Sequence, residues 1–227
     1  MKPNFLLLAA VGTLLSFNFL NAQTVVTSDF TTVADGRVQS SGVLGLELFS
    51  AEEDIRTLMS GPSNISDGLF EFDLSSLPSD AVVTSVELLL RTAAAISNTS
   101  GTAPVEFFGY TGNGTIELSD ESAAATSVAS AAFPTTFVNG DSVSVPLSNL
   151  AIIDSVLTDA NTSDFFGIRS ETENFVDFRV DSLESTDPNA APARLRLTYQ
   201  TAAVPEPSSL AVVGALGLGF IARRRRT

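Results

Sequence analysis

The sequence has no cysteine, no histidine and no tryptophan, and each absence removes a class of chemistry. Without Cys and His, a catalytic triad built on His, a Cys nucleophile and a Cys/His zinc site are all excluded. No disulfide can form, whatever compartment the chain occupies. Carboxylates, hydroxyls, phenols and guanidinium groups therefore carry any chemistry that the chain performs.

Positive charge is also scarce, since 12 Lys and Arg face 26 Asp and Glu and leave a formal net charge of −14. This acid surplus argues against nucleic acid as a partner, because the phosphates would be repelled. Hydrophobic residues make up 44% of the chain and charged residues 17%, a composition that is not typical of disorder. The length of 227 residues fits one domain with two special ends.

The first 22 residues have the pattern of a secretory signal peptide. Lys2 gives a basic start, the stretch from Phe5 to Phe19 is almost wholly apolar, and the bond between Ala22 and Gln23 follows a small-residue cleavage pattern. We therefore expect export through the Sec translocon, with cleavage after Ala22. A buried N-terminal helix is the alternative, but the apolar stretch lacks an amphipathic period.

Residues 204–227 combine a proline-rich start, an apolar stretch from Leu210 to Ala222 and a basic tail. The stretch is shorter than the ~20 residues of a typical spanning helix, and arginines beside it would stay on the cytoplasmic side. A nucleic-acid patch is the alternative. The interior of the chain, however, carries seven arginines and no lysine against 25 carboxylates, so a membrane stop explains the tail better.

This ending resembles the PEP-CTERM sorting signal, which is also catalogued as the ice-binding protein C-terminal domain family. The residues that carry the resemblance are Pro205, Glu206, Pro207, Arg223, Arg224, Arg225 and Arg226. The resemblance implies transient anchoring in the inner membrane, processing by an exosortase near the tripeptide, and delivery to the cell surface or the extracellular matrix.

Between residues 23 and 203 the dominant hydrophobic period is two, which is typical of strands with one buried face. The alternating stretches run over residues 44–48, 70–74, 82–90, 143–147, 176–180 and 195–199. Pro146 suits an edge strand. We expect an all-β, antiparallel sandwich or jelly roll, because antiparallel sheets commonly have one solvated face.

Turn signals separate these stretches and divide the domain into short strands. They occur at residues 35–36, 60–62, 67–68, 77–80, 113–114 and 139–141. One helix is expected after Ser148, which could cap it, with Leu150, Ile153 and Leu157 on one face. A second short turn could start at Ser119.

The middle of the chain resembles the DNRLRE-type β-sandwich family. The resemblance rests on residues 68–78 (GLFEFDLSSLP), 83–88, 166–170 and the closing 191–199 (APARLRLTY). It implies a sandwich fold like that of carbohydrate-binding domains of bacterial surface proteins. The family's usual Arg-x-Leu is replaced here by Asp67-Gly68-Leu69, which is a departure at any shared binding site.

Carboxylates are the candidate acid and base groups. Glu71 and Asp73 lie two apart on one strand, roughly 7 Å from each other by strand rise, which is within the range of a glycosidase pair. The alternative is a solvated strand face, which we favour because we expect no hydrophobic desolvation there that would raise one pKa. Asp177 and Arg179 indicate a surface ion pair.

Calcium is the one metal that the composition favours, because hard oxygen ligands in loops suit it. One cluster contains Asp159, Asn161 and Asp164, and another contains Asp181, Glu184, Asp187 and Asn189. Neither has EF-hand spacing. The alternative is that both are solubilising acidic loops.

Sugar binding usually needs an exposed aromatic ring. Phe108 and Tyr110 share one strand face, opposite Phe107, and one of the two faces could be exposed. The alternative is that a crossing loop buries both faces, and the lack of Trp weakens the sugar hypothesis further.

Three functions remain open from the sequence. The first is a non-enzymatic exported β-sandwich of the cell surface or extracellular matrix. The second is a module that binds extracellular polysaccharide, with or without calcium. The third is a glycan-cleaving enzyme that uses carboxylates alone. We expect no catalytic residue and therefore favour the first.

Overall fold

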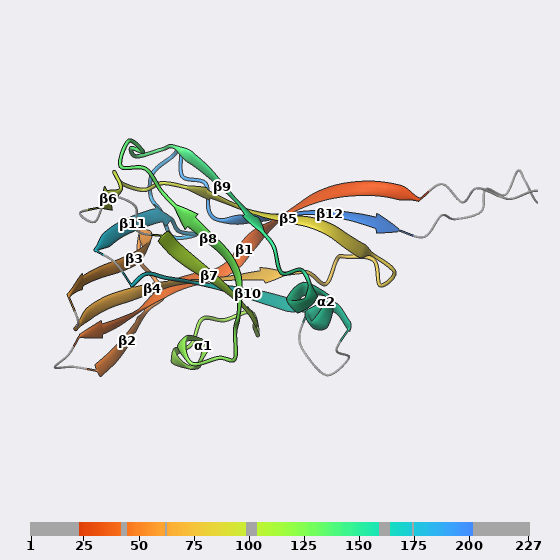
Figure 1. Cartoon of the computed structure of the whole chain (residues 1–227), viewed down its shortest axis with the longest axis horizontal. Helices are drawn as coiled ribbons and strands as arrows, with labels where there is room; N and C mark the ends of the chain where they lie inside the picture. The colour runs from red at the N-terminus through yellow and green to blue at the C-terminus, as the bar shows by residue number, and fades with distance from the viewer. Residues whose placement is uncertain are drawn as a thin grey trace, which may run out of the picture. The chain divides into compact units, whose positions relative to one another are not determined.

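The computed structural model describes residues 23–41, 45–61, 63–98, 104–158, 164–173 and 175–201. Antiparallel strands dominate this part of the chain (Figure 1), which confirms the predicted all-β sandwich. The strands are β1 (Thr24–Ser41), β2 (Gly45–Phe49), β3 (Asp54–Gly61), β4 (Asn64–Asp73), β5 (Val82–Arg91), β6 (Ser97–Asn98), β7 (Pro104–Thr111), β8 (Thr126–Ala132), β9 (Ser142–Leu147), β10 (Phe165–Glu171), β11 (Val176–Asp181) and β12 (Arg194–Thr201).

Two groups of strands form the layers of the sandwich. In the smaller group β5 lies between β9 and β12, so β9, which carries Pro146, is an edge strand as predicted. In the larger group β4 pairs with β1 along one edge. Its other edge is shared, because β3 pairs with the start of β4 and β10 with the rest. The layer continues from β10 to β7 and β8, and from β3 to β11 and β6.

The long strand β1 belongs to both groups. Its first half runs beside β12, where the Thr32 amide donates to the carbonyl of Ala193 at 2.9 Å. Its second half pairs with β4 and β2. A register shift at Val33 separates the halves and leaves that side chain 46% exposed. Such bulges bend a strand, so the bulge explains how β1 passes from one layer to the other.

The main core fills the space between the layers. It contains inward-facing side chains of the strands, and Phe133, which follows β8, stacks there on Phe178 of β11 with ring centroids 4.4 Å apart. The largest fully buried members include Phe70, Phe72, Phe107, Phe166 and Ile168. Burial of this apolar surface is the principal stabilising contribution to the fold.

A second core lies on the outer face of the larger layer. It consists of Val38, Leu69, Tyr110 and Ile116. Ile116 and the packed alanines, Ala123 and Ala125, come from the segment 112–125, which includes the short helix α1 (Leu118–Glu121) and covers this face. The sequence predicted one solvated face for each strand, and here that prediction is wrong because a connecting segment folds back over the sheet.

The helix α2 (Ala151–Thr158) is present where the sequence placed it, with Ile153 and Val156 in the main core. Ser148 does not cap this helix. Its amide and its hydroxyl both donate to the carbonyl of Val128, at 2.8 and 3.0 Å, so it ties the loop to β8. Neither of the two helices in the described residues is long and apolar enough to cross a membrane.

Two predicted turns are strand interiors. Gly36 lies within β1, and a Cβ there would come within 2.9 Å of the Phe49 carbonyl oxygen. Gly68 lies within β4, where a Cβ would approach Ser170 Oγ to 2.7 Å and Ile55 Cγ2 to 2.8 Å. Both glycines allow close packing, which a sequence signal for turns does not distinguish.

The phase of β5 also differs from the prediction. The alternation placed Val82 and Thr84 on the buried face, but Val82 is 60% exposed and Val83 is buried. The pairing with β12 shifts register between Thr198 and Tyr199, so Thr84 is an extra residue there. From Val86 onward the predicted alternation holds.

Candidate functional site

The predicted sorting and cleavage residues lie mostly outside the described residues. These are Ala22, Pro205, Glu206, Pro207, Arg223, Arg224, Arg225 and Arg226. Gln23 is described, and it is exposed immediately before β1. The predictions for these residues are tested below by comparison with known families.

The predicted calcium ligands Asp159 and Asn161 also lie outside the described residues, while Asp164 is exposed next to β10. The second acidic stretch is used in ion pairing: Arg91 Nη1 lies 2.6 Å from Asp181 Oδ2 and 3.5 Å from Asp187 Oδ2. Within the described ranges, no three Asp or Glu residues are grouped so that they could hold a metal ion. Calcium binding by the loop at 159–164 stays a prediction.

The predicted aromatic platform is not exposed as a pair. Tyr110 is completely buried in the second core, while Phe107 is buried on the other side in the main core. Phe108 is half-buried, with the Arg169 guanidinium 5.7 Å from its ring centroid. The prediction that Tyr110 offers a ring to a sugar is therefore wrong. The physical reason is the cover provided by residues 112–125, the alternative that the sequence left open.

Glu71 was expected on a solvated face, and this prediction is wrong as well. Its side chain is fully buried, and its Oε2 accepts hydrogen bonds from the amides of Asn113 at 3.1 Å and Gly114 at 2.5 Å. Gly114 has φ +88°, a conformation that favours glycine. Burial raises the pKa of Glu71, against the lowering effect of these amides. Asp73 is half-buried, and its Oδ1 accepts from the amide of Ser75 at 2.9 Å.

Glu71 is part of a buried carboxyl cluster, which we define as Asp67, Glu71, Asp120 and the half-buried Glu121. Burial raises the pKa of Asp67 to about 8, and the neighbouring charges of Glu121 and Glu171 raise it further. Burial likewise raises the pKa of Asp120 and of Glu121. Within the described residues, Oδ1 of Asp67, Oε1 of Glu71 and Oε2 of Glu121 accept no hydrogen bond.

Arg169 is the cation of this cluster. Its Nη1 donates to the carbonyls of Asp120 at 3.0 Å and Glu121 at 2.6 Å, and its Nε pairs with Glu171. Arg169 thus fastens the end of α1 to β10. These contacts hold the covering segment against the sheet.

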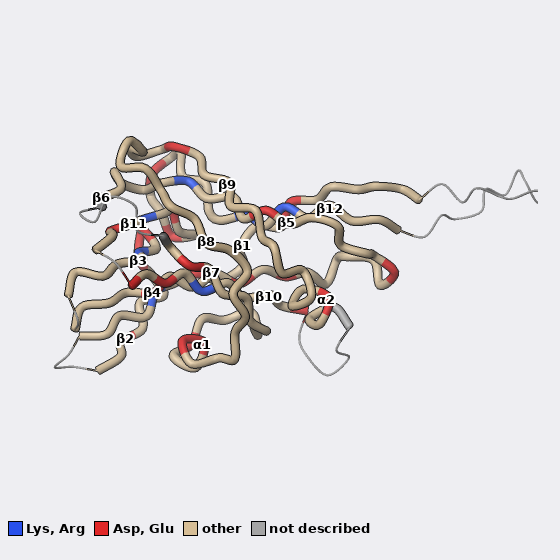
Figure 2. Tube along the Cα trace, in the orientation of Figure 1, with Lys and Arg blue, Asp and Glu red and all other residues tan. Residues whose placement is uncertain are grey.

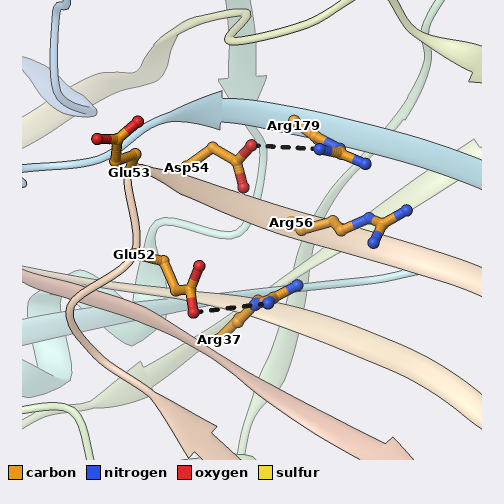
Figure 3. Close-up of a pocket in the computed structure, with 6 residues that line it drawn as sticks. All are labelled: Arg37, Glu52, Glu53, Asp54, Arg56 and Arg179. Carbon is orange, nitrogen blue, oxygen red and sulfur yellow. Dashed lines mark hydrogen bonds and ion pairs between the residues drawn. The ribbon is translucent and has the colours of Figure 1, made fainter. Parts of the chain in front are cut away.

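A second charged site is open to solvent. We call it the arginine hollow and define it by Arg37, Glu52, Glu53, Asp54, Arg56 and Arg179 (Figure 3). Its volume is about 390 Å³. Acidic side chains are spread along the chain while basic ones are few (Figure 2), and yet three of the seven interior arginines meet here.

Strand pairing brings the arginines of the hollow together. Arg56 on β3 and Arg179 on β11 are direct register partners. Arg37 comes from β1, where its guanidinium lies 4.7 Å above the ring centroid of Phe49. Glu52 and Glu53 precede β3, and Asp54 is its first residue. The hollow therefore joins three strands that are far apart in the sequence.

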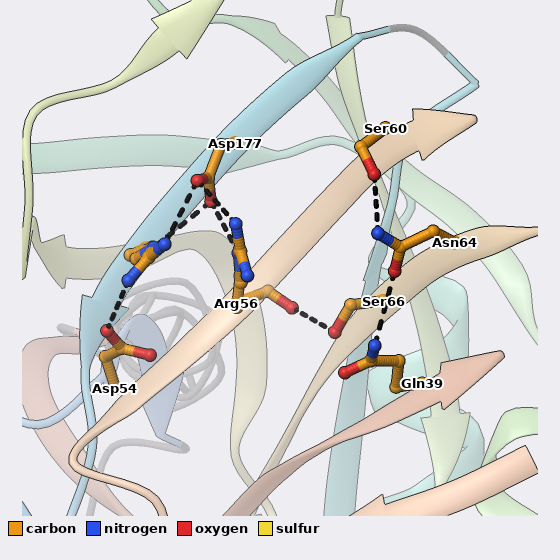
Figure 4. A network of polar contacts seen from close by, with 8 residues as sticks. Gln39, Asp54, Arg56, Ser60, Asn64, Ser66 and Asp177 are labelled. Carbon is orange, nitrogen blue, oxygen red and sulfur yellow. Dashed lines mark hydrogen bonds and ion pairs between the residues drawn. The ribbon is translucent and has the colours of Figure 1, made fainter. Parts of the chain in front are cut away.

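Asp177 fixes two of the arginines. Its two carboxylate oxygens accept from Nε and Nη2 of Arg56, both at 2.7 Å, and from Nε and Nη2 of Arg179, both at 3.2 Å (Figure 4). Partial burial raises the pKa of Asp177, but these hydrogen bonds outweigh it and hold that pKa below its ordinary value. The predicted ion pair between Asp177 and Arg179 is confirmed, with Arg56 as a further partner.

The other ion pairs of the hollow are loose. Arg37 Nη2 lies 3.8 Å from Glu52 Oε1, and Arg179 Nη1 lies 3.5 Å from Asp54 Oδ2. The Nε of Arg37 is buried and has no hydrogen-bond partner in the described part of the chain. The guanidinium groups and carboxylates of the hollow face the same open space, and the ion pairs use only part of their donors and acceptors.

A row of uncharged polar groups continues this surface. Asn64 on β4 accepts from Gln39 on β1 at 3.2 Å and donates to Ser60 on β3 at 2.6 Å (Figure 4). Gln39 lies two residues after Arg37, hence on the same face of β1. The sequence analysis missed the hollow and the row, and the available signal was weak: Asp54/Arg56 and Asp177/Arg179 each follow an acid–x–arginine pattern.

Comparisons with known proteins identify one end of the chain. Residues 203–226 match the PEP-CTERM protein-sorting motif, which confirms that part of the predicted resemblance. No curated protein matches the chain. The motif marks an exported protein that an exosortase processes during membrane-associated sorting to the cell surface.

Proposed function

We propose that this chain is a non-enzymatic β-sandwich of the cell surface or extracellular matrix, released from a transient inner-membrane anchor by an exosortase. The observation that carries the proposal is the sorting motif at residues 203–226, which begins two residues after the last strand ends at Thr201. The motif directs sorting, and the folded strands before it are the cargo. The predicted signal peptide at residues 1–22 would supply the export route.

The carboxylates support a non-catalytic role. A general acid needs a raised pKa and access to substrate. The buried carboxyl cluster has raised pKa values but is covered by residues 112–125. Asp177 beside the hollow is accessible, but its arginine partners hold its pKa low. Glu121 has a raised pKa and is only half-buried, but the charge of Arg169 beside it counters that rise.

The proposal is tested by following processing in the native host. An internally tagged chain should lose Arg223 to Arg226 in cells that contain the exosortase and retain them in cells that lack it. Glu206→Ala should leave unprocessed protein in the inner membrane, because a single carboxylate between Pro205 and Pro207 is held in an extended segment that a processing enzyme can recognise.

The matched control is Glu47→Ala, which removes an exposed carboxylate from β2. This variant should be processed and released like the wild type. Normal release of the Glu206→Ala variant, or an intact arginine tail on the surface protein, would contradict the proposal.

A second candidate function is the binding of extracellular polysaccharide, and the arginine hollow is the observation that favours it. It is open, and guanidinium donors and carboxylate acceptors line it together. A glycan array probed with and without chelator tests this function and any dependence on calcium in one experiment.

A further inference from the structure

We propose that the arginine hollow binds an uncharged sugar unit of a polysaccharide and discriminates against acidic polysaccharides. The inference rests on the second candidate function and specifies its ligand class and its residues. Three arginines and three carboxylates line the hollow, and Asp177 pairs with Arg56 and Arg179 beside it, so the site has no surplus of positive charge. A uronate or sulfate group would face as many carboxylates as guanidinium groups, within a chain whose net charge is already −14.

The hydrogen-bonding capacity of the hollow matches hydroxyl groups. A hydroxyl donates one hydrogen bond and accepts others, so it can lie between a guanidinium group and a carboxylate and satisfy both. The pair of Arg37 Nη2 with Glu52 Oε1 is 3.8 Å long, so a bridging hydroxyl could close it, whereas Arg179 and Asp54 already share a long hydrogen bond of 3.5 Å. A sugar unit presents several hydroxyls together, and hydrogen bonds to charged partners are among the stronger ones.

The hollow is held in place before any ligand arrives. Asp177 fixes Arg56 and Arg179 through four hydrogen bonds, and Phe49 supports the Arg37 guanidinium. Fixing these side chains in advance reduces the entropy that binding would otherwise lose. The volume of about 390 Å³ lies near the lower end of the ~300–1,000 Å³ range of small-molecule sites, which suits one sugar unit.

The neighbouring polar row provides room for the next unit of a chain. Gln39, Asn64 and Ser60 are exposed or half-exposed and extend the polar face from β1 across β4 to β3. Their side chains carry no charge, so they favour an uncharged polymer over an acidic one. The inferred ligand is therefore a neutral polysaccharide with one unit in the hollow and its neighbour on the row.

The test measures binding of the full chain, purified in a detergent without a sugar headgroup, to immobilised polysaccharides. Dextran and galactomannan represent uncharged polymers, and alginate represents acidic ones. We expect binding to at least one uncharged polymer and none to alginate. Arg37→Gln and Glu52→Gln should each weaken that binding about tenfold or more, because each removes a charged hydrogen-bonding partner.

Arg196→Gln is the matched control, because Arg196 forms an exposed pair with Asp29 on β1, away from the lining of the hollow. This variant should bind like the wild type. Glu52→Gln keeps the experiment decisive if Arg37→Gln fails to fold, since the Glu52 side chain is 40% exposed and its ion pair is long.

The outcomes separate the inference from the function on which it rests. If the wild type binds no polysaccharide on the array, both the binding function and the inference are wrong. If it binds alginate alone, or if Glu52→Gln strengthens binding, the site is an anion site and the inference is wrong while the binding function stands. Binding to an uncharged polymer that neither hollow variant weakens would place the sugar elsewhere on the chain.

Discussion

The arginine hollow and the buried carboxyl cluster are built from the same residue types on opposite faces of one sheet. Arg37 and Val38 are neighbours on β1, and Arg37 lines the hollow while Val38 packs in the second core beside the cluster. In the hollow three arginines accompany three carboxylates, whereas Arg169 alone accompanies the four carboxyls of the cluster. The two charged clusters therefore differ in how many arginines accompany their carboxyls and in how far solvent reaches them.

The difference between the hollow and the cluster also appears in the direction in which the pKa of their carboxyls shifts. Asp177, with two arginines, has a lowered pKa although burial alone would raise it. Asp67, buried beside Glu121 and Glu171, has a pKa raised to about 8. The arginines therefore favour the charged form of Asp177, whereas burial favours the protonated form of Asp67 in the folded state. The three predictions below perturb the second core, the cluster and the hollow in turn.

The largest effect should come from Gly167→Ala, which disturbs the packing of Tyr110 in the second core. A Cβ at Gly167 would clash with the ring of Tyr110, which has no room to move within the second core. We expect a loss of about 3 kcal/mol in the free energy of unfolding, the upper range for overpacking. Urea unfolding followed by far-UV circular dichroism measures it.

Gly61→Ala is the control for that experiment, since a Cβ there would have no neighbour within 4 Å. It should change the free energy of unfolding by less than about 0.5 kcal/mol. Equal effects of the two substitutions would show that Tyr110 does not fill the space above Gly167.

The next effect concerns pH and the cluster. Asp67 has a folded pKa of about 8 and an ordinary value of 3.8, so between these values the folded state binds a proton that the unfolded state has released. The stabilisation is fully present below pH 3.8 and is lost as pH rises through about 8. Asp67→Asn, which cannot ionise, should make the chain more stable than the wild type at pH 9, by on the order of 1–3 kcal/mol.

The difference between Asp67→Asn and the wild type should shrink toward pH 5, in thermal or urea unfolding at each pH. Glu173→Gln, at an exposed position, serves as the control and should leave the pH profile unchanged. A wild-type profile that rises steadily from pH 5 to pH 9 would show that the cluster is ionised in the folded state.

The smallest effect should come from the hollow. Asp177→Asn removes the shared partner of Arg56 and Arg179, but the site is solvated, so the loss should not exceed about 1 kcal/mol at pH 7. Because the pKa of Asp177 is lowered, this stabilisation is present above the ordinary value of 3.8 and is lost as pH falls below it. The variant and the wild type should therefore converge near pH 2, and a difference that persists there would point to packing instead of charge.

The sequence predicted the strands whose period is regular, because alternation reports one buried face directly. The stretches at 143–147, 176–180 and 195–199 lie within strands of the structure, and 70–74 lies in β4 except for Leu74. The sequence pattern did not predict β1. The 18 residues of this strand change layers at Val33, and the two halves bury different sides of the strand. A local period cannot describe a strand that serves two sheets.

The two charged sites could not be predicted for a related reason. Glu71 has the spacing of a solvated residue, and only the return of residues 112–125 over the sheet buries it. Arg37, Arg56 and Arg179 come together through the pairing of β3 with β11 and of β1 with β4, which single-strand patterns do not specify. Both sites depend on long-range contacts, whereas the sorting motif is a contiguous segment and was therefore recognisable.

The sharing of β1 between the layers has a consequence for the order of events during synthesis. Its first half is held by the last strand, through side chains 165 to 171 positions away, such as Asp29 with Arg194 and Arg196, and Thr27 with Thr198. Contacts of such high sequence separation form slowly, and the opening strand must remain without its partner until nearly the whole domain has emerged. The next residues to emerge are those of the sorting motif. The first strand can therefore complete its pairing only once the residues directly before the motif are available.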